Sequence, residues 1–374
     1  MAKILSSVAC NLDVHILSAS IPLLEESQVD AIEWSFDTLF NIWHTPGWFA
    51  RLLTAFSKEE RLIGHGVFFS LLSGKWSKEQ YQWLSQLKQL SAEFHFDHIT
   101  EHFGFMTGQS FHQGAPMCVP YSPATLAIGR DRLARIQEAC SCPVGLENLA
   151  FAASLEQVKQ QGEFLERLIE PVNGFIILDL HNLFCQMHNF FMDFEQLLSS
   201  YPLERVREIH ISGGSWEKSG KQSERIIRRD THDQAVPPEV FHLLEKTIPV
   251  CPNLKYVVLE QLGIALKTQE SKAAFYQNFV QMKQIVEDNN QTIANSSENP
   301  FIPPSITLPE TFVENQELYA QQRELSEILE TSSSYEETNR LLKASSLAHT
   351  AWNIESWDPA MIETAIHIAR KWKK

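Results

Sequence analysis

Eight short apolar runs, separated by longer stretches with helical patterns, constrain the fold of this 374-residue chain more than any other feature. Val, Ile, Leu and Phe dominate these runs, as expected of parallel strands that are buried on both faces. The predicted strands are Lys3–Cys10, Val29–Trp34, Leu62–Phe69, Phe96–Phe103, Pro143–Asn148, Gly174–Asp179, Arg205–Ser212 and Lys255–Gln261.

The stretches between the runs predict helices. Ser77 with Gln80 forms the signature of a capping box, and Ser122 before Pro123 marks another helix start. Eight alternating strands and helices with right-handed crossovers predict a closed (β/α)8 barrel, a TIM barrel of the α/β class. An open, doubly wound sheet is the alternative, but it favours a glycine-rich loop after the first strand, and residues 8–11 contain no glycine.

The composition changes after the last predicted strand and its helix. Residues 288–311 are polar and contain several prolines, which is typical of a linker. An apolar stripe that includes Leu318 and Leu325 then predicts helices. We therefore predict a barrel over residues 1–287, a linker over 288–311 and a small helical C-terminal extension over 312–374.

Charge and cysteine usage restrict the possible partners. Asp and Glu number 46 against 31 Lys and Arg, so the net charge of -15 repels nucleic-acid phosphates. Polar residues interrupt the N-terminal apolar stretch, no run is long enough to span a bilayer, and the six cysteines lack a disulfide pattern. We expect a cytoplasmic protein with reduced cysteines that binds neither nucleic acid nor a membrane.

Ionisable side chains gather at the ends of the predicted strands. These ends meet at one face of a barrel, where barrel enzymes have their active sites. Few Lys or Arg residues lie there to neutralise the carboxylates, so bound metal ions are the economical explanation. The candidate ligands are His65, His102, Glu147, Asp179, His181, His210, Asp230, His232 and Glu260.

A single histidine at a strand end is more often a hydrogen-bonded core residue than a ligand. The chain, however, has two Asp-x-His pairs, at residues 179–181 and 230–232. Both side chains of the first pair are predicted to lie on one strand face, because side chains in a strand repeat with period two. The same holds for the second pair if that stretch is extended. Together with His and Glu residues on other strands, the pairs favour a metal centre.

The residue types limit the chemistry of such a centre. No cysteine belongs to the candidate set, which argues against a closed structural zinc site, and no G-x-S-x-G motif predicts a serine nucleophile. Histidine and carboxylate ligands with open positions suit non-haem iron, and they also suit manganese or catalytic zinc.

Eight segments, in chain order, carry a resemblance to a known family. They are His65–Ser70, Thr100–Phe103, Cys118–Tyr121, Gly145–Asn148, Ile177–Asn182, Glu208–Gly214, Arg229–Val236 and Val258–Gln261. The chain resembles, over roughly its first 290 residues, the multinuclear non-haem iron-dependent oxidative enzymes, a bacterial family long catalogued as a domain of unknown function. The resemblance implies a barrel of the xylose-isomerase-like type.

The resemblance also implies an activity. Members oxidise ribosomally made peptides, commonly at cysteine, with iron and molecular oxygen as in natural-product or metallophore maturation, and a separate partner protein often delivers the peptide. We accordingly expect an oxidoreductase with two or three iron ions (Fe2+/Fe3+). By resemblance, the ligands are His65, His102, Glu147, Asp179, His181 or Asn182, His210, Asp230, His232 and Glu260, with Glu147, Asp179 and His210 as catalytic residues and Glu101 and Asn148 orienting the ligands.

The chain departs from the family pattern near these residues. His181 stands where many members have Asn, Gly214 where many have His, and Gln261 and Leu262 where many have Trp-Asp. These departures change the expected pocket. The alternatives are a metal-dependent sugar isomerase, epimerase or hydrolase on the same barrel, and a non-catalytic metal-binding protein. The C-terminal helices either dock a peptide or partner protein or only pack on the barrel.

Overall fold

The computed structural model describes residues 3–40, 45–108, 114–222, 224–291 and 299–371. Eight parallel strands form a closed barrel in the order β1-β12-β9-β8-β7-β4-β3-β2, so the predicted (β/α)8 barrel is confirmed. The strands are β1 (Leu5–Cys10), β2 (Ala31–Trp34), β3 (Leu62–His65), β4 (Ile99–His102), β7 (Val144–Glu147), β8 (Phe175–Asp179), β9 (Val206–Ile211) and β12 (Tyr256–Leu259). Each lies within one of the eight predicted strands.

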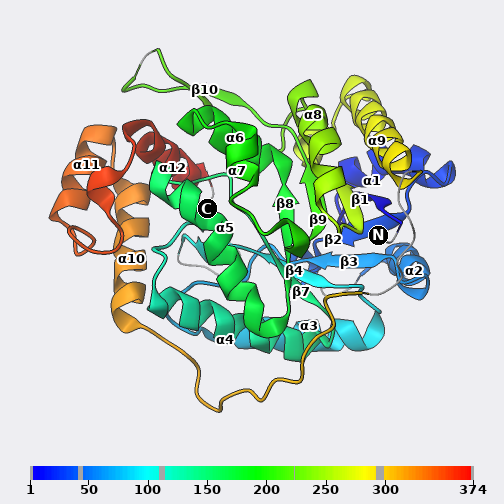
Figure 1. Ribbon diagram of the computed structural model, residues 1–374, viewed down its shortest axis with the longest axis horizontal. Coiled ribbons are helices and arrows are strands. Elements are labelled where there is room, and N and C mark those ends of the chain that lie inside the picture. The colour runs from blue at the N-terminus through cyan, green and yellow to red at the C-terminus, as the bar shows by residue number, and fades with distance from the viewer. Residues whose placement is uncertain (1–2, 41–44, 109–113, 223, 292–298, 372–374) are drawn as a thin grey trace.

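Helices surround the barrel (Figure 1). They are α1 (Val14–Glu25), α2 (Gly47–Lys58), α3 (Lys78–Glu93), α4 (Pro123–Cys140), α5 (Leu155–Ile169), α6 (Leu180–Phe190), α7 (Phe194–Leu198), α8 (Pro238–Thr247) and α9 (Gln269–Asn290). The Ser77 hydroxyl accepts from the Gln80 N–H at 3.2 Å, and the Gln80 side chain accepts from the Ser77 N–H at 3.0 Å. This capping box begins α3, and Ser122 caps α4, as the sequence predicts.

Two hairpins extend from the carboxyl ends of the barrel strands, the end that we call the mouth. One consists of β5 (Phe105–Met106) and β6 (Pro116–Met117) and follows β4. The other consists of β10 (Trp216–Lys218) and β11 (Ile226–Arg228) and follows β9. The sequence did not predict either hairpin, because strands of two or three residues carry too short a pattern.

From residue 299 onward, the chain crosses the opposite end of the barrel before it turns toward the mouth. Asn299 accepts from Arg207, the second residue of β9, at 2.9 Å, and Phe301 packs on Phe175 and Ile177 of β8. The following segment then runs past α4 (Figure 1), where Arg135 donates to the backbone carbonyl of residue 309 at 2.9 Å. This segment is therefore bound along the barrel.

The C-terminal helices are α10 (Gln316–Thr331), α11 (Tyr335–Ala344) and α12 (Pro359–Lys371). They pack on loops that follow barrel strands at the mouth: Gln322 accepts from the Gly74 N–H, and the Asp358 N–H donates to Ala153, each at 2.8 Å. The division into barrel, linker and extension remains a prediction, since residues 292–298 of the predicted linker lie outside the described residues.

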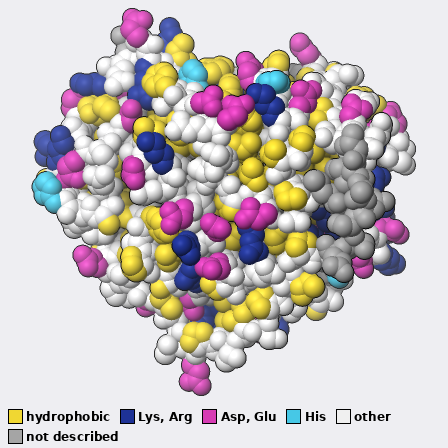
Figure 2. Space-filling model, viewed as in Figure 1, with side chains coloured by type: hydrophobic (Ala, Val, Ile, Leu, Met, Phe, Trp, Pro, Cys, Tyr) yellow, Lys and Arg dark blue, Asp and Glu magenta, His cyan; other side chains and the backbone are white. Residues whose placement is uncertain are grey.

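On the face shown in Figure 2, basic side chains are interspersed with acidic ones and form no continuous stripe. Within the described ranges, none of the helices has both the length and the apolar character needed to cross a bilayer.

The packing of Phe301 generates a stability prediction. Its side chain is 1% exposed, and its ring centroid lies 5.6 Å from that of Phe175. We expect Phe301→Ala to lower the free energy of unfolding by about 3–5 kcal/mol, the usual cost of removing a buried aromatic ring. Ile302→Ala is the matched control, because Ile302 is 69% exposed. If urea denaturation showed the same decrease in the free energy of unfolding for both variants, this role of Phe301 would be contradicted.

Candidate metal centre

Apolar and ionisable side chains share the interior of the barrel. Ala31, Ile63 and Tyr256 form a small buried apolar cluster near the amino ends of their strands, and the ring of the buried His98 lies beside that of Tyr256. Two residues further along, on the same faces, β2 presents Glu33 and β3 presents His65. From this level to the mouth, buried ionisable side chains are concentrated in the interior.

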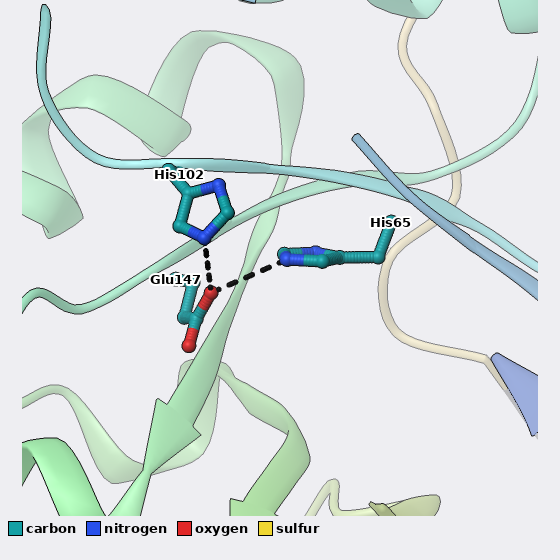
Figure 3. Close-up of side chains that lie close together, drawn as sticks. All are labelled: His65, His102 and Glu147. Atoms are coloured by element: carbon teal, nitrogen blue, oxygen red, sulfur yellow. Dashed lines mark ion pairs between the residues drawn. The ribbon is translucent and has the colours of Figure 1, made fainter. Parts of the chain in front are cut away.

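The first candidate group consists of His65, His102 and Glu147, the last residues of β3, β4 and β7. The Nε2 atoms of both histidines lie 3.4 Å from Oε2 of Glu147, and all three side chains point toward one another (Figure 3). Nδ1 of His65 lies 2.9 Å from the Thr100 hydroxyl, which itself donates to the Gly64 carbonyl at 3.2 Å. His65 therefore donates through Nδ1, which leaves Nε2 to face the group.

The second candidate group consists of Glu147, Asp179, His210 and Glu260, whose ligand atoms lie within 4.8 Å of one another. Nδ1 of His210 lies 3.3 Å from Oε2 of Glu260 and 3.8 Å from Oε1 of Glu147. Glu147 thus turns one oxygen toward each group. A carboxylate in this position can bridge two ions.

Asp179 ends β8 and is also the N-cap of α6. Its Oδ1 accepts from the Asn182 N–H at 2.5 Å, while its Oδ2 is buried without a hydrogen-bond partner among the described residues. His181 consequently lies in the first turn of α6, so the prediction of an extended Asp179–His181 pair is wrong. Asn148 holds this junction, because its Oδ1 accepts from the Asp179 N–H at 2.7 Å.

The second Asp-x-His pair is not extended either. His232 has a φ of 50°, in the left-handed region, yet its Nε2 still lies 2.9 Å from Oδ1 of Asp230. The turn, and not the period of a strand, brings the two side chains together. Nδ1 of His232 lies 3.7 Å from Oε2 of Glu260, which places the pair beside the second group.

His181 uses both ring nitrogens within the protein. Its Nδ1 lies 2.9 Å from Oδ1 of Asp230, and its Nε2 accepts from Nε of Arg228 at 3.0 Å. The position of the His181 ring also requires a residue without a side chain at Gly214. A Cβ atom there would lie 2.8 Å from Cε1 of His181 and 2.1 Å from the Arg229 carbonyl oxygen. His181 and Gly214, two departures from the family pattern, therefore pack against each other.

Glu101 lies away from the candidate ligands. A Cβ atom on Gly66 would lie 1.7 Å from Oε1 of Glu101, so the glycine after His65 makes room for this carboxyl group. Burial, followed by the nearby charge of Asp37, raises the pKa of Glu101 well above its ordinary value. Among the described residues, its carboxyl oxygens make no hydrogen bond to a candidate ligand side chain, whereas Asn148 binds the backbone of Asp179.

Sequence reasoning missed several buried residues of the site. Glu33 and Glu208 form a third group with His210, with ligand atoms within 4.8 Å of one another. Asp37 accepts from the Val67 N–H at 3.0 Å and so fixes the loop after His65. The sequence does carry a signal for Glu33 and for Glu208. Glu33 is a lone charged residue within an apolar strand, and Glu208 lies two residues before His210, so the two side chains are on the same face of one strand.

The ionisable groups strongly perturb one another. Burial alone would lower the pKa of His65, but its hydrogen bond to Glu147 raises it to about 9. Burial would likewise lower the pKa of His232, but the charge of Asp230 raises it to about 10. For His102 burial prevails and lowers the pKa to about 4. In the metal-free protein, protonated imidazoles therefore partly neutralise the carboxylates.

These shifts predict how the stability of the metal-free protein depends on pH. A histidine with a raised pKa stabilises the fold while it is protonated. The contribution is complete below the ordinary pKa of 6.5 and is lost as pH rises through about 9 for His65 and about 10 for His232. We expect the unfolding free energy, measured with a chelator present, to fall from pH 6.5 to 10, and to fall less in His232→Gln. If the unfolding free energy fell equally steeply with pH in the wild type and in His232→Gln, the prediction would be contradicted.

Comparisons with known proteins identify a family. The family described as "RiPP precursor modification enzyme MbnB/TglH/ChrH" matches residues 22–264. A UPF0276 protein of Paraburkholderia phytofirmans is 29% identical over 52% of this chain, and one of Acaryochloris marina is 27% identical over 49%. The chain spans 62% and 64% of the length of these curated relatives.

Solved structures with the same kind of barrel are more distant. The zinc-bound IolI protein is 13% identical with a TM-score of 0.48, and the match covers 76% of this chain and 99% of that one. Endonuclease IV from Thermus thermophilus is 12% identical with a TM-score of 0.47, over 76% and 99% of the two chains. Because the family match extends over more than half of its length, this chain belongs to the MbnB/TglH/ChrH family of RiPP precursor modification enzymes.

Proposed function

We propose that this chain is a multinuclear iron enzyme that uses molecular oxygen to oxidise a ribosomally made peptide at cysteine. The observation that carries the proposal is the position of Glu147, which turns one carboxylate oxygen toward each of two ligand groups. A bridging carboxylate is what a centre of two or more ions requires. Membership of a family of peptide-modifying enzymes supports the peptide as substrate.

The donor atoms fit such a centre. Asp179 Oδ2 and Asn182 Oδ1 are buried and have no hydrogen-bond partner among the described residues. A buried acceptor without a donor is costly, and a cation would satisfy both. His210 Nδ1 faces the carboxylates of Glu147 and Glu260, so a cation could take the place of its proton. Nitrogen and oxygen donors without thiolate suit iron, and they also accept manganese or zinc.

We assign the candidate ligands as follows. One ion would be held by His65, His102 and Glu147, and a second by Glu147, Asp179, His210 and Glu260. Asp230 and His232, beside Glu260, would hold a third, with Asn182 as a further oxygen donor near Asp179. Both ring nitrogens of His181 already have partners within the protein. We therefore propose that His181 orients Asp230 and does not itself bind a metal ion.

The chemistry divides between the ions and the protein. When bound, iron supplies open coordination positions and the electrons that activate oxygen. The protein fixes the geometry: Asn148 holds the backbone of Asp179, and Asp37 holds the loop after His65. The peptide loses electrons and protons to oxygen, so removal of two hydrogen atoms would leave hydrogen peroxide, and removal of four would leave two water molecules.

The rim of the mouth bears on peptide delivery. Arg225 of the β10–β11 hairpin contacts Asp358, and Ser219 contacts Glu363 of α12. We propose that the C-terminal helices stabilise this rim and that a separate partner protein delivers the peptide. Deletion of the chain after Asp288 tests this assignment: it should destabilise the barrel, whereas lost peptide binding with a stable barrel would favour docking by the helices.

The decisive experiment is anaerobic purification followed by elemental analysis, a visible spectrum and oxygen-uptake measurements with a cysteine-containing precursor peptide. We expect two or more irons per chain and an oxygen-dependent loss of hydrogen mass from the peptide. Stoichiometric zinc or manganese without iron, after expression with iron supplied, would contradict the proposal. That result would favour an isomerase, epimerase or hydrolase on the same barrel.

The shared position of Glu147 generates a prediction for variants. We expect Glu147→Ala to lower the metal content by more than one ion per chain, whereas His65→Ala should remove one, because only Glu147 belongs to both groups. Peptide oxidation should fall by more than the roughly 10–100-fold typical of a residue outside the ligand shell. His242→Ala is the control, since His242 lies on α8 with its side chain 63% exposed. Unchanged metal content in Glu147→Ala would disprove the assignment.

A further inference from the structure

A row of ionisable side chains continues from the metal centre through the interior of the barrel. Glu33, Glu208 and His98 are each fully buried, at 0% exposure, below the ligand His210. In barrels of this kind, interior layers are usually filled by Val, Ile and Leu. These residues, which lie outside the first two candidate groups, therefore need an explanation.

The contacts of His210 fix the state of its ring. Nε2 lies 3.0 Å from Oε2 of Glu33 and 3.4 Å from Oε1 of Glu208, so it carries a hydrogen and donates to carboxylate. Nδ1 lies on the other side of the ring, toward Glu147 and Glu260. The acceptors below the ring thus direct the lone pair of Nδ1 to the centre. The opposite tautomer would present an N–H there and could not bind a cation.

Glu208 is itself held from below. Its Oε2 lies 2.6 Å from Nε2 of His98, whose Nδ1 lies 2.9 Å from Oδ2 of Asp97. Arg207 donates to the same Asp97 oxygen at 2.7 Å, and Lys255 contacts the other oxygen. The row ends at Asp97, before β4, at the end of the barrel opposite the mouth. Glu208 is therefore tied to a fixed point of the scaffold.

Stability alone does not account for this arrangement. Buried charges cost several kcal/mol each unless they are fully paired, and apolar residues of similar size are often no less stable. Oε1 of Glu33 is buried and has no hydrogen-bond partner among the described residues. A carboxylate retained under these conditions is expected to serve the site that it touches.

We infer that Glu33 is a positioning residue that holds the His210 ring and its tautomer so that Nδ1 faces the metal, with Glu208 and His98 as its support. The inference rests on the proposed function only in that His210 holds a metal ion. It matches the general need of a ligating histidine for a carboxylate on its second nitrogen.

The test is Co2+ binding to the chelator-treated full chain, followed by visible absorption without peptide or oxygen. Glu33→Gln keeps the shape but presents an amide that can donate to Nε2, which would place the hydrogen on Nδ1. We expect Co2+ affinity about 10–100-fold weaker and an altered Co2+ spectrum, while the melting temperature without metal does not fall. Glu33→Asp keeps the carboxylate but moves it away from the His210 ring. Its Co2+ affinity should therefore lie between that of Glu33→Gln and that of the wild type.

Two controls make the outcome specific. Asp131→Asn removes another buried carboxylate, paired with Arg132 and Arg135 outside the centre, and should leave Co2+ affinity unchanged. In a His210→Ala background, a Glu33 that acts through the ring should have no additional effect when changed to Gln, because the imidazole that it positions is gone.

Wild-type affinity in Glu33→Gln, an undiminished effect in the His210→Ala background, or unfolding of the metal-free variant would each overturn the inference. The last result would show a structural role. A wild-type chain that binds no Co2+ would remove both the centre and the positioning role. A chain that behaves as expected here but oxidises no peptide would contradict the proposed function alone.

Discussion

Glu147 is a buried carboxylate that lies among three imidazoles, those of His65, His102 and His210. The arrangement of side chains at the mouth of the barrel depends on how the negative charge of Glu147 is neutralised. An unpaired charge at this depth would be expelled or protonated. Imidazoles from three strands therefore converge on one carboxylate. In the metal-free protein protons supply the positive charge, so a metal ion that binds at this candidate centre would release them, and its occupancy would depend on pH.

The strand register makes this convergence possible. His102 pairs with Glu147 across β4 and β7, and Asp179 pairs with His210 across β8 and β9. Residues that are partners in the ladder lie at one level of the barrel, so the candidate ligands form a layer at its mouth. Closure of the barrel brings that layer into a ring. Loops supply only Asp230, His232 and Glu260.

The sequence predicts the barrel and the position of ionisable residues at the strand ends because both depend on local patterns. Short apolar runs reveal buried parallel strands, and a polar residue that closes such a run stands out, as His65 and Glu147 do. The extended geometry predicted for the Asp-x-His pair at residues 179–181 is wrong, because Asp179 is both the last residue of β8 and the N-cap of α6. Glu33 and Glu208 were missed for a different reason: a strand that is buried on both faces gives no alternation that marks its interior side.

The position of the C-terminal helices has a consequence for synthesis. All eight barrel strands precede residue 260 in the chain, whereas α10–α12, which pack on the mouth loops, come after residue 315. During translation the strands that carry the candidate ligands emerge from the ribosome first, and the rim contacts of Asp358 and Glu363 form only later. The residues of the candidate metal centre are therefore synthesised before the helices that cover this side of the mouth.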